Sequence, residues 1–175
     1  ADMCFADDVN KVLMGILKKK NFQHLRSPLS FIFKEFIFNA NKANLKRVFF
    51  RLNCLNINLP QDYEDGMKDF PKAMREEIYK ISSYLNDYKK YVKVIFHEYT
   101  DKDFVFYIIN NSQLTEHEKQ RIQDKIALYS KVNKDENALF NILDETEGAG
   151  MGLFLSLKLM KQFGIDNRGF KIGVH

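Results

Sequence analysis

The chain has 175 residues, of which 45% are hydrophobic and 16 are Phe, so it is long enough and apolar enough to form one substantial core. Its 27 basic and 23 acidic side chains give a formal net charge of +4, an excess too small to indicate a nucleic-acid-binding protein. We find no signal-peptide pattern and no apolar stretch of roughly 18 residues, and Cys4 and Cys54 are too far apart to suggest a disulfide framework or a zinc site. We therefore expect a cytoplasmic protein with no membrane insertion in this chain.

The first part of the chain is predicted to be helical. Asp8 to Lys19 has the pattern of a short amphipathic helix. A long apolar run from about Leu29 to Asn53 predicts a second helix, in which Ser27 is the expected N-cap and Pro28 the expected first helical residue.

The middle of the chain is predicted to change from irregular to helical and then to β-structure. Cys54 to Pro71 contains prolines and a glycine and is expected to be irregular, whereas Phe70 to Leu85 has helical charge spacing. Tyr91 to Tyr99 and Phe104 to Ile109 are rich in β-forming residues and are joined by a turn at 101–103. This pattern predicts a β-hairpin.

The last part of the chain is predicted to hold two helices and a strand. Thr115 to Tyr129 is a predicted helix, with Thr115 as N-cap and Glu118 completing a capping box. A polar segment follows, then a helix from Met151 to Phe163 that ends at Gly164, and then a last strand from Phe170 to Val174. Helices on one face of a mixed sheet describe an α+β, two-layer α/β sandwich.

Three glycines at alternate positions, Gly148, Gly150 and Gly152, lead directly into the predicted helix that begins at Met151. Glycine permits close approach of a ligand to the backbone, and a helix N-terminus offers unpaired N–H groups at the positive end of a dipole. Together these features are typical of a phosphate cradle, although glycine-rich loops also serve as plain hinges.

The long helix predicted from Leu29 carries three polar side chains on one face. Glu35, Asn39 and Lys42 stand at i, i+4 and i+7 among several phenylalanines. One interpretation is an ordinary amphipathic helix whose polar stripe faces water. The other is that a carboxylate, an amide and an ammonium group face a metal-bound triphosphate.

Taken together, the two segments resemble the GHKL ATPase family, which includes histidine kinase catalytic domains, gyrase B, Hsp90 and MutL. The family's N-box, E-x-x-x-N-A, corresponds to Glu35 to Ala40, and its second glycine box, G-x-G-x-G-L, corresponds to Gly148 to Leu153. The resemblance covers about 28–175 and implies a Bergerat (GHKL-type) sandwich. Residues 1–27 would then form an N-terminal helical extension to a histidine kinase-like ATP-binding domain.

A third box departs from the family pattern. The family's D-x-G-x-G at a strand end is matched in this sequence by Asn110, Ser112 and Leu114 in place of the aspartate and both glycines. The resemblance gives the aspartate the role of accepting a hydrogen bond from the adenine amino group, and an asparagine carbonyl oxygen can also accept one. Asn110 to Gln113 also has the composition of a simple turn at the end of a strand.

The resemblance implies a site for ATP and Mg²⁺. Glu35 would be the general base, Asn39 would bind the metal through its amide oxygen, and Lys42 would contact a phosphate. Gly148, Gly150 and Gly152 would present backbone N–H groups to the triphosphate, and the polar segment before them would correspond to the family's ATP lid.

The implied function is phosphoryl transfer from ATP in signal transduction, to an acceptor outside this chain. His24 precedes a Leu-Arg-Ser-Pro-Leu string like that of a kinase phosphoacceptor box, but it stands too close to Glu35 for the helical hairpin of a kinase. The alternative is a degenerate member that senses nucleotide or binds a regulatory protein without kinase activity, as the changes at Asn110, Ser112 and Leu114 would favour. A third interpretation is an unrelated α+β binding domain.

Overall fold

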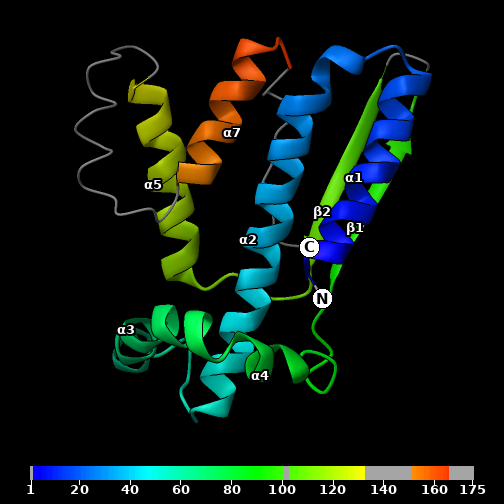
Figure 1. Ribbon diagram of the computed structural model, residues 1–175. Coiled ribbons are helices and arrows are strands. Elements are labelled where there is room, and N and C mark those ends of the chain that lie inside the picture. Colours follow the sequence, from blue (N-terminus) through cyan, green and yellow to red (C-terminus); the bar gives the residue numbers. More distant parts are fainter. Residues whose placement is uncertain (1, 101–102, 133–150, 166–175) are drawn as a thin grey trace. The chain divides into compact units, whose positions relative to one another are not determined.

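The computed structural model describes residues 2–100, 103–132 and 151–165. Within these ranges it combines helices with one two-stranded antiparallel sheet, so the α+β class expected from the sequence is confirmed (Figure 1). The last strand expected at 170–174 lies outside the described residues, and the GHKL-type sandwich stays a prediction.

The chain divides into two compact units that share one long helix. One unit comprises residues 1–5 and 37–115, and the other comprises 6–36 and 116–175. The boundary between Phe36 and Ile37 falls inside helix α2, which runs from Arg26 to Leu52. The sequence-based division into 1–27 and 28–175 stays a prediction.

Helix α2 begins three residues earlier than the sequence indicated. A short 3₁₀ turn, η1 (Gln23–Leu25), leads directly into it, and the backbone N–H of Arg26 donates to the Gln23 carbonyl. Ser27 therefore lies inside the first turn, and its assignment as N-cap is wrong. Pro28 is tolerated there because N–H groups of the first turn have no intrahelical acceptor.

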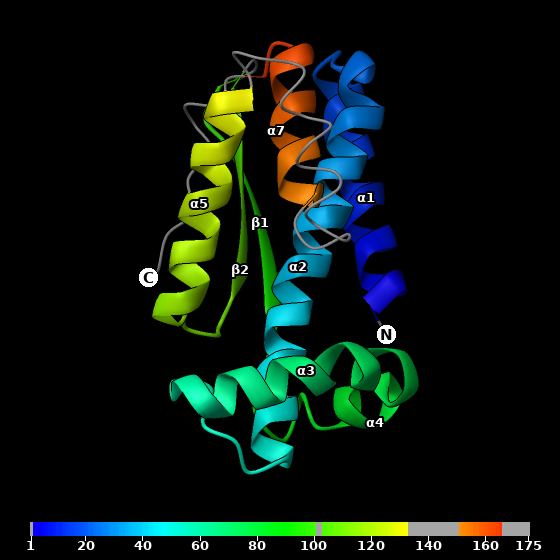
Figure 2. The same cartoon turned by 90° about the vertical axis from the view of Figure 1, so that its left-hand side faces the viewer.

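The unit that includes 116–175 is built in its described part from helices. Besides the start of α2 it contains most of α1 (Asp2–Lys19), α5 (Glu116–Val132) and α7 (Met151–Gln162), and Figure 2 shows α5 and α7 side by side. Tyr129 of α5 contacts Phe154 of α7, with ring centroids 5.4 Å apart, and its hydroxyl donates to the Leu157 carbonyl at 3.1 Å. The buried apolar residues of this unit include Leu13, Leu17, Leu29, Ile32, Phe33, Tyr129, Leu157 and Met160.

Both ends of α7 carry features that the sequence predicted. The helix begins within the glycine segment, at Met151, and stops before Gly164, whose φ is +66°. The Gly164 N–H donates to the Lys161 carbonyl at 3.2 Å, and the Ile165 N–H donates to the Met160 carbonyl at 2.8 Å. These two bonds form a Schellman C-cap, which requires a residue in the left-handed region and therefore favours glycine.

The unit that includes 37–115 has its core where the second half of α2 meets two further helices. These are α3 (Pro60–Glu76) and α4 (Ile78–Ser83), so the prediction that Cys54 to Pro71 is irregular is wrong over most of its length. Pro60 stands at the first helical position, where proline is favourable, and Gly66 lies against the Phe50 ring. The buried cluster consists of Leu45, Val48, Phe49, Phe50, Phe70, Ala73 and Ile81.

The same unit contains the β-hairpin that the sequence predicted. Strand β1 (Val92–Glu98) pairs antiparallel with β2 (Phe104–Asn110), and Val92 stands opposite Asn110. The Tyr99 N–H donates to the Asp103 carbonyl at 3.1 Å and closes the connection. The hairpin places Asn110 at the end of the second strand, as expected from the sequence.

Candidate functional site

The two predicted nucleotide-binding segments meet at Glu35 and Gly152. The Glu35 side chain lies so close to Gly152 that a Cβ atom added to this glycine would overlap the carboxylate (Figure 1 shows the two helices that carry them). Glu35 is half-buried, and both residues belong to the same compact unit. A side chain at 152 would therefore require the flexible end of Glu35 to move away.

This contact places a carboxylate at the N-terminal turn of α7. Gly152 is the second residue of that helix, where backbone N–H groups have no acceptor within the helix and the dipole is positive. A negative charge is stabilised in such a place, whether it comes from a side chain or from a phosphate. In the structure the Glu35 carboxylate lies at this position, and phosphate binding there stays a prediction.

Of the other predicted site residues in these two segments, the structure describes Asn39 and Lys42. Asn39 and Lys42 follow Glu35 along α2 and are exposed, as side chains that bind a ligand from solvent must be. Gly148 and Gly150 lie outside the described residues, as does the polar segment from 133 onward that was expected to form a lid.

Asn110 lies against the N-box part of α2. Its amide NH₂ donates to the backbone carbonyl of Ala40 at 3.3 Å, within the unit that includes 37–115. The strand end that corresponds to the family's third box is thus attached to the residue after Asn39. With the NH₂ group engaged in this way, the Oδ1 atom is the part of Asn110 suited to accept a hydrogen bond from an adenine amino group.

Ser112 has a structural role that the sequence did not reveal. Its hydroxyl donates to Asn44 Oδ1 at 2.6 Å, and both residues are buried. The Asn44 amide in turn donates to the Tyr91 carbonyl at 2.9 Å. A polar chain therefore links α2, the start of β1 and the segment after β2, at a position where the GHKL family has a glycine.

An open groove of about 630 Å³, not predicted from the sequence, lies beside the start of α2, and none of the predicted site residues lines it. It is lined by Asn10, Met14, Gln23, Arg26, Ser27, Ser30, Phe31 and Lys34. The basic residues Arg47 and Arg51, which follow Asn44 along α2, were not predicted as site residues either.

Metal binding has to be judged from the donor groups. The described residues contain no cluster of three or more His, Cys, Asp or Glu side chains suited to hold a metal ion by themselves. Mg²⁺ in nucleotide sites takes one or two protein ligands and completes its octahedron with phosphate oxygens and water. An exposed amide oxygen such as that of Asn39 fits this requirement.

Across 2–100, 103–132 and 151–165, no helix is both long enough and apolar enough to cross a membrane.

The chain has a relative among known proteins. No known family and no solved structure matches the chain. The chain is similar to an uncharacterized protein of Treponema pallidum (strain Nichols), with 33% identity over 166 residues, or 95% of this chain. The matched region is 32% of that relative, so the chain spans about a third of its length. The GHKL resemblance therefore depends on the sequence motifs alone.

Proposed function

We propose that the chain contains a GHKL-type nucleotide-binding domain that binds ATP with Mg²⁺ and passes the terminal phosphoryl group to an acceptor outside this chain. The observation that carries the proposal is the contact between Glu35 and Gly152. It joins the predicted N-box to the predicted glycine box, although the two are far apart in sequence, and it does so at a helix N-terminus suited to an anion.

The roles of the residues follow from their chemistry. Glu35 accepts a proton from the attacking hydroxyl or imidazole group, Asn39 binds Mg²⁺ through its amide oxygen, and Lys42 neutralises phosphate charge. Mg²⁺ held by Asn39 would supply positive charge to the triphosphate. Phosphoryl transfer depends mainly on positioning and electrostatic stabilisation. The Glu35 carboxylate, as general base, is therefore needed for the chemical step but not for nucleotide binding.

Base selectivity is assigned to Asn110. Its Oδ1 atom accepts from the amino group of adenine, whereas guanine presents a carbonyl oxygen at the corresponding position. ATP is therefore expected to bind more tightly than GTP.

The test separates binding from turnover with isosteric variants. Calorimetric titration with Mg²⁺-ATP should give similar affinities for wild type and Glu35→Gln. With water as the acceptor of the phosphoryl group, wild type should form ADP and phosphate slowly, and Glu35→Gln should form none. Asn39→Ala should weaken binding when Mg²⁺ is present and leave binding in EDTA unchanged. Glu64→Gln and Asn86→Ala change exposed residues and serve as matched controls. The proposal fails if wild-type protein binds no ATP.

A second candidate function is nucleotide sensing or protein binding without phosphoryl transfer. It is favoured by the hydrogen bond from Ser112 to Asn44, which holds the strand end rigidly where the kinases have a permissive glycine loop. In that case wild type binds ATP but forms no ADP with any acceptor, and Glu35→Gln changes neither property.

A further inference from the structure

The open groove beside the start of α2 is not used by the proposed nucleotide site. All eight residues that line it belong to the compact unit that includes 6–36, and they come from α1, η1 and α2. The lining contains two cations, two hydroxyl groups and no carboxylate. A volume of about 630 Å³ is within the range of small-molecule binding sites.

Arg26 is the cation of this groove that lacks a strong partner. Its side chain is exposed, and its Nε atom donates to the Met14 sulfur at 3.2 Å. A thioether is only a weak acceptor. Within 2–100, 103–132 and 151–165, no carboxylate pairs with the Arg26 guanidinium. Because Nε is directed to Met14, the two Nη groups remain as a planar fork for another acceptor.

Further donors lie on the same side of α2 as Arg26. Ser27 follows it directly, and Ser30 and Lys34 stand one and two turns later. The hydroxyls of Ser27 and Ser30 have no hydrogen-bond partner in the part of the chain that the structure describes. The Lys34 ammonium lies 3.3 Å from the Asp7 carboxylate, which offsets its charge. The groove thus offers one cation without a carboxylate partner, together with two hydroxyl donors.

Apolar side chains lie beside these donors. Phe31 is 39% exposed, although Ile32 and Phe33, the next two residues, are buried. Met14 is half-buried and lines the groove from α1. An apolar surface with a few polar groups that fix orientation is typical of sites for small organic ligands. The ligand that fits has an apolar body next to an anionic group.

We propose that this groove binds a carboxylate attached to an apolar group, as in a small aromatic acid or in the C-terminal residue of a peptide. The Nη groups of Arg26 hold the two carboxylate oxygens as a bidentate pair, and the Ser30 hydroxyl donates to one of them. Phe31 and Met14 contact the apolar group. One unpaired cation matches the single charge of a carboxylate better than the higher charge of a phosphate monoester. The site shares no residue with the proposed nucleotide site.

The test is titration of the full chain with phenylacetate, in EDTA and without nucleotide, followed by the NMR shifts of backbone amides. We expect saturable shifts in α1 and at the start of α2. Arg26→Gln should raise the dissociation constant by about tenfold or more, because a charge-assisted bidentate pair is lost. Phe31→Ser should weaken the binding of phenylacetate but not that of acetate. Both replaced side chains are exposed, so both variants should fold.

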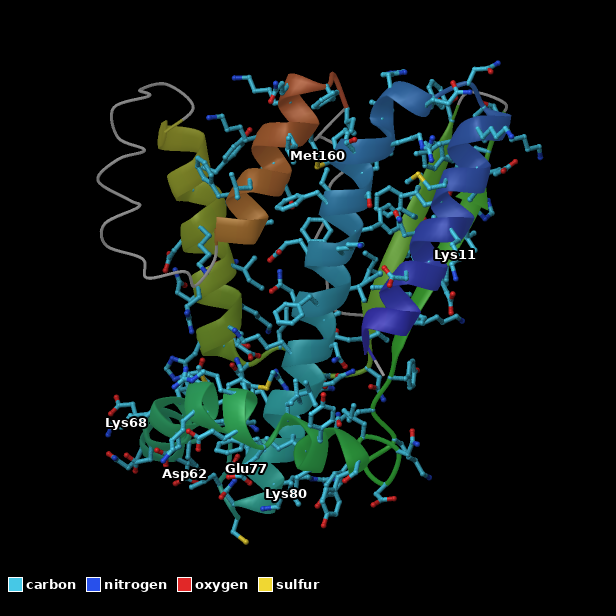
Figure 3. The ribbon with its side chains drawn as sticks, in the orientation of Figure 1. Lys11, Asp62, Lys68, Glu77, Lys80 and Met160 are labelled. Carbon is cyan, nitrogen blue, oxygen red and sulfur yellow. The ribbon has the colours of Figure 1, made fainter. Side chains whose placement is uncertain are left out.

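Controls assign the effect to this site and identify the source of its ligand. Lys11→Gln removes an exposed lysine that pairs with Asp8 outside the groove, and it should bind like wild type (Figure 3 labels Lys11). Phenylacetamide, which has no charge, should not bind. If an acetylated tripeptide that ends in phenylalanine with a free carboxylate binds more tightly than phenylacetate, the ligand is a peptide C-terminus. Equal or weaker binding of the tripeptide identifies a small acid.

Three results would overturn the proposal. The first is that phenylacetate gives no saturable shifts in α1 and at the start of α2. The second is that Arg26→Gln binds phenylacetate as tightly as wild type. The third is that phenylacetamide binds as tightly as phenylacetate. Because nucleotide and Mg²⁺ are absent, none of these results depends on whether the chain binds ATP.

Discussion

At the scale of single residues, the sequence indicated which side chains deserve notice better than it indicated which residues they contact. Glu35, in a predicted N-box, and Gly152, in a predicted glycine box, contact each other in the structure, and their sharing of a nucleotide site stays a prediction. The bond from Ser112 to Asn44 was not foreseeable, because nothing in the local sequence tells which buried amide a serine will reach.

The Glu35 contact opposes the gain that Gly152→Ala would otherwise bring to a helix. The added methyl group overlaps the flexible end of the Glu35 side chain, which must rotate away into another rotamer at a cost of about 0.5–1.5 kcal/mol. Gly15→Ala is the matched control: a Cβ there has nothing within 4 Å, so it should stabilise by about 0.5–1 kcal/mol. Urea unfolding measures both. In a Glu35→Ala background the cost of Gly152→Ala should disappear, and an unchanged cost would refute the contact.

The buried Ser112 hydroxyl predicts a second cost. Ser112→Gly restores the family's glycine but leaves Asn44 Oδ1 without its donor, and an unsatisfied buried acceptor costs about 1–3 kcal/mol. Ser83→Ala, which removes an exposed hydroxyl bonded to the Lys80 carbonyl, should change the free energy of unfolding much less. Equal effects of the two substitutions would show that the Ser112 bond carries no stability.

At the scale of elements, helices and strands that are marked by nearby turn or capping residues were predicted correctly. A helix that depends on packing against distant residues was not. The β-hairpin, the start of α5 after Thr115 and the C-cap of α7 each follow from nearby turn or capping residues. Helix α3 was missed because Pro60, Gly66 and Pro71 suggested a loop. The helix forms nevertheless because Phe70 and Ala73 are buried in the cluster around Phe49 and Phe50.

The two prolines of α3 should respond oppositely to replacement. Pro71 is inside the helix, where it removes a backbone hydrogen bond and crowds the preceding turn, an effect of about 3 kcal/mol in a helix interior. Pro71→Ala should therefore stabilise the protein, by less than that amount if the helix is already relaxed around it. Pro60 begins the helix, so Pro60→Ala should be neutral or slightly destabilising. Urea unfolding of the two variants checks the order, and a loss of stability in Pro71→Ala would contradict it.

Charged side chains on α3 and α4 are expected to matter little. Lys68 pairs with Asp65 and Lys80 pairs with Glu77, each at 3.0 Å and each strongly exposed (Figure 3 labels Lys68, Glu77 and Lys80). Exposed pairs of this kind contribute little to stability. Lys80→Gln should therefore leave the melting temperature nearly unchanged, and a large loss would mean that α4 depends on this ion pair rather than on the burial of Ile81.

At the scale of the whole molecule, the α+β class was predicted from the order of helical and β-rich segments. The assignment of residues to compact units was not predicted, because the boundary lies within α2 and no glycine, proline or polar linker marks it. Glu35 therefore belongs to one unit and Asn39 to the other.

The measurement that tests the central claim most directly is calorimetric titration of wild type, Gly152→Ala and Gly15→Ala with ATP in the presence of Mg²⁺. Glu35 and the start of α7 are proposed to belong to one nucleotide site, so wild type and Gly15→Ala should bind one ATP with similar affinity and Gly152→Ala should bind much more weakly. ATP at 100 times its dissociation constant should also stabilise wild type by about 2.7 kcal/mol. Absence of binding in wild type, or equal affinity in all three proteins, would contradict the claim.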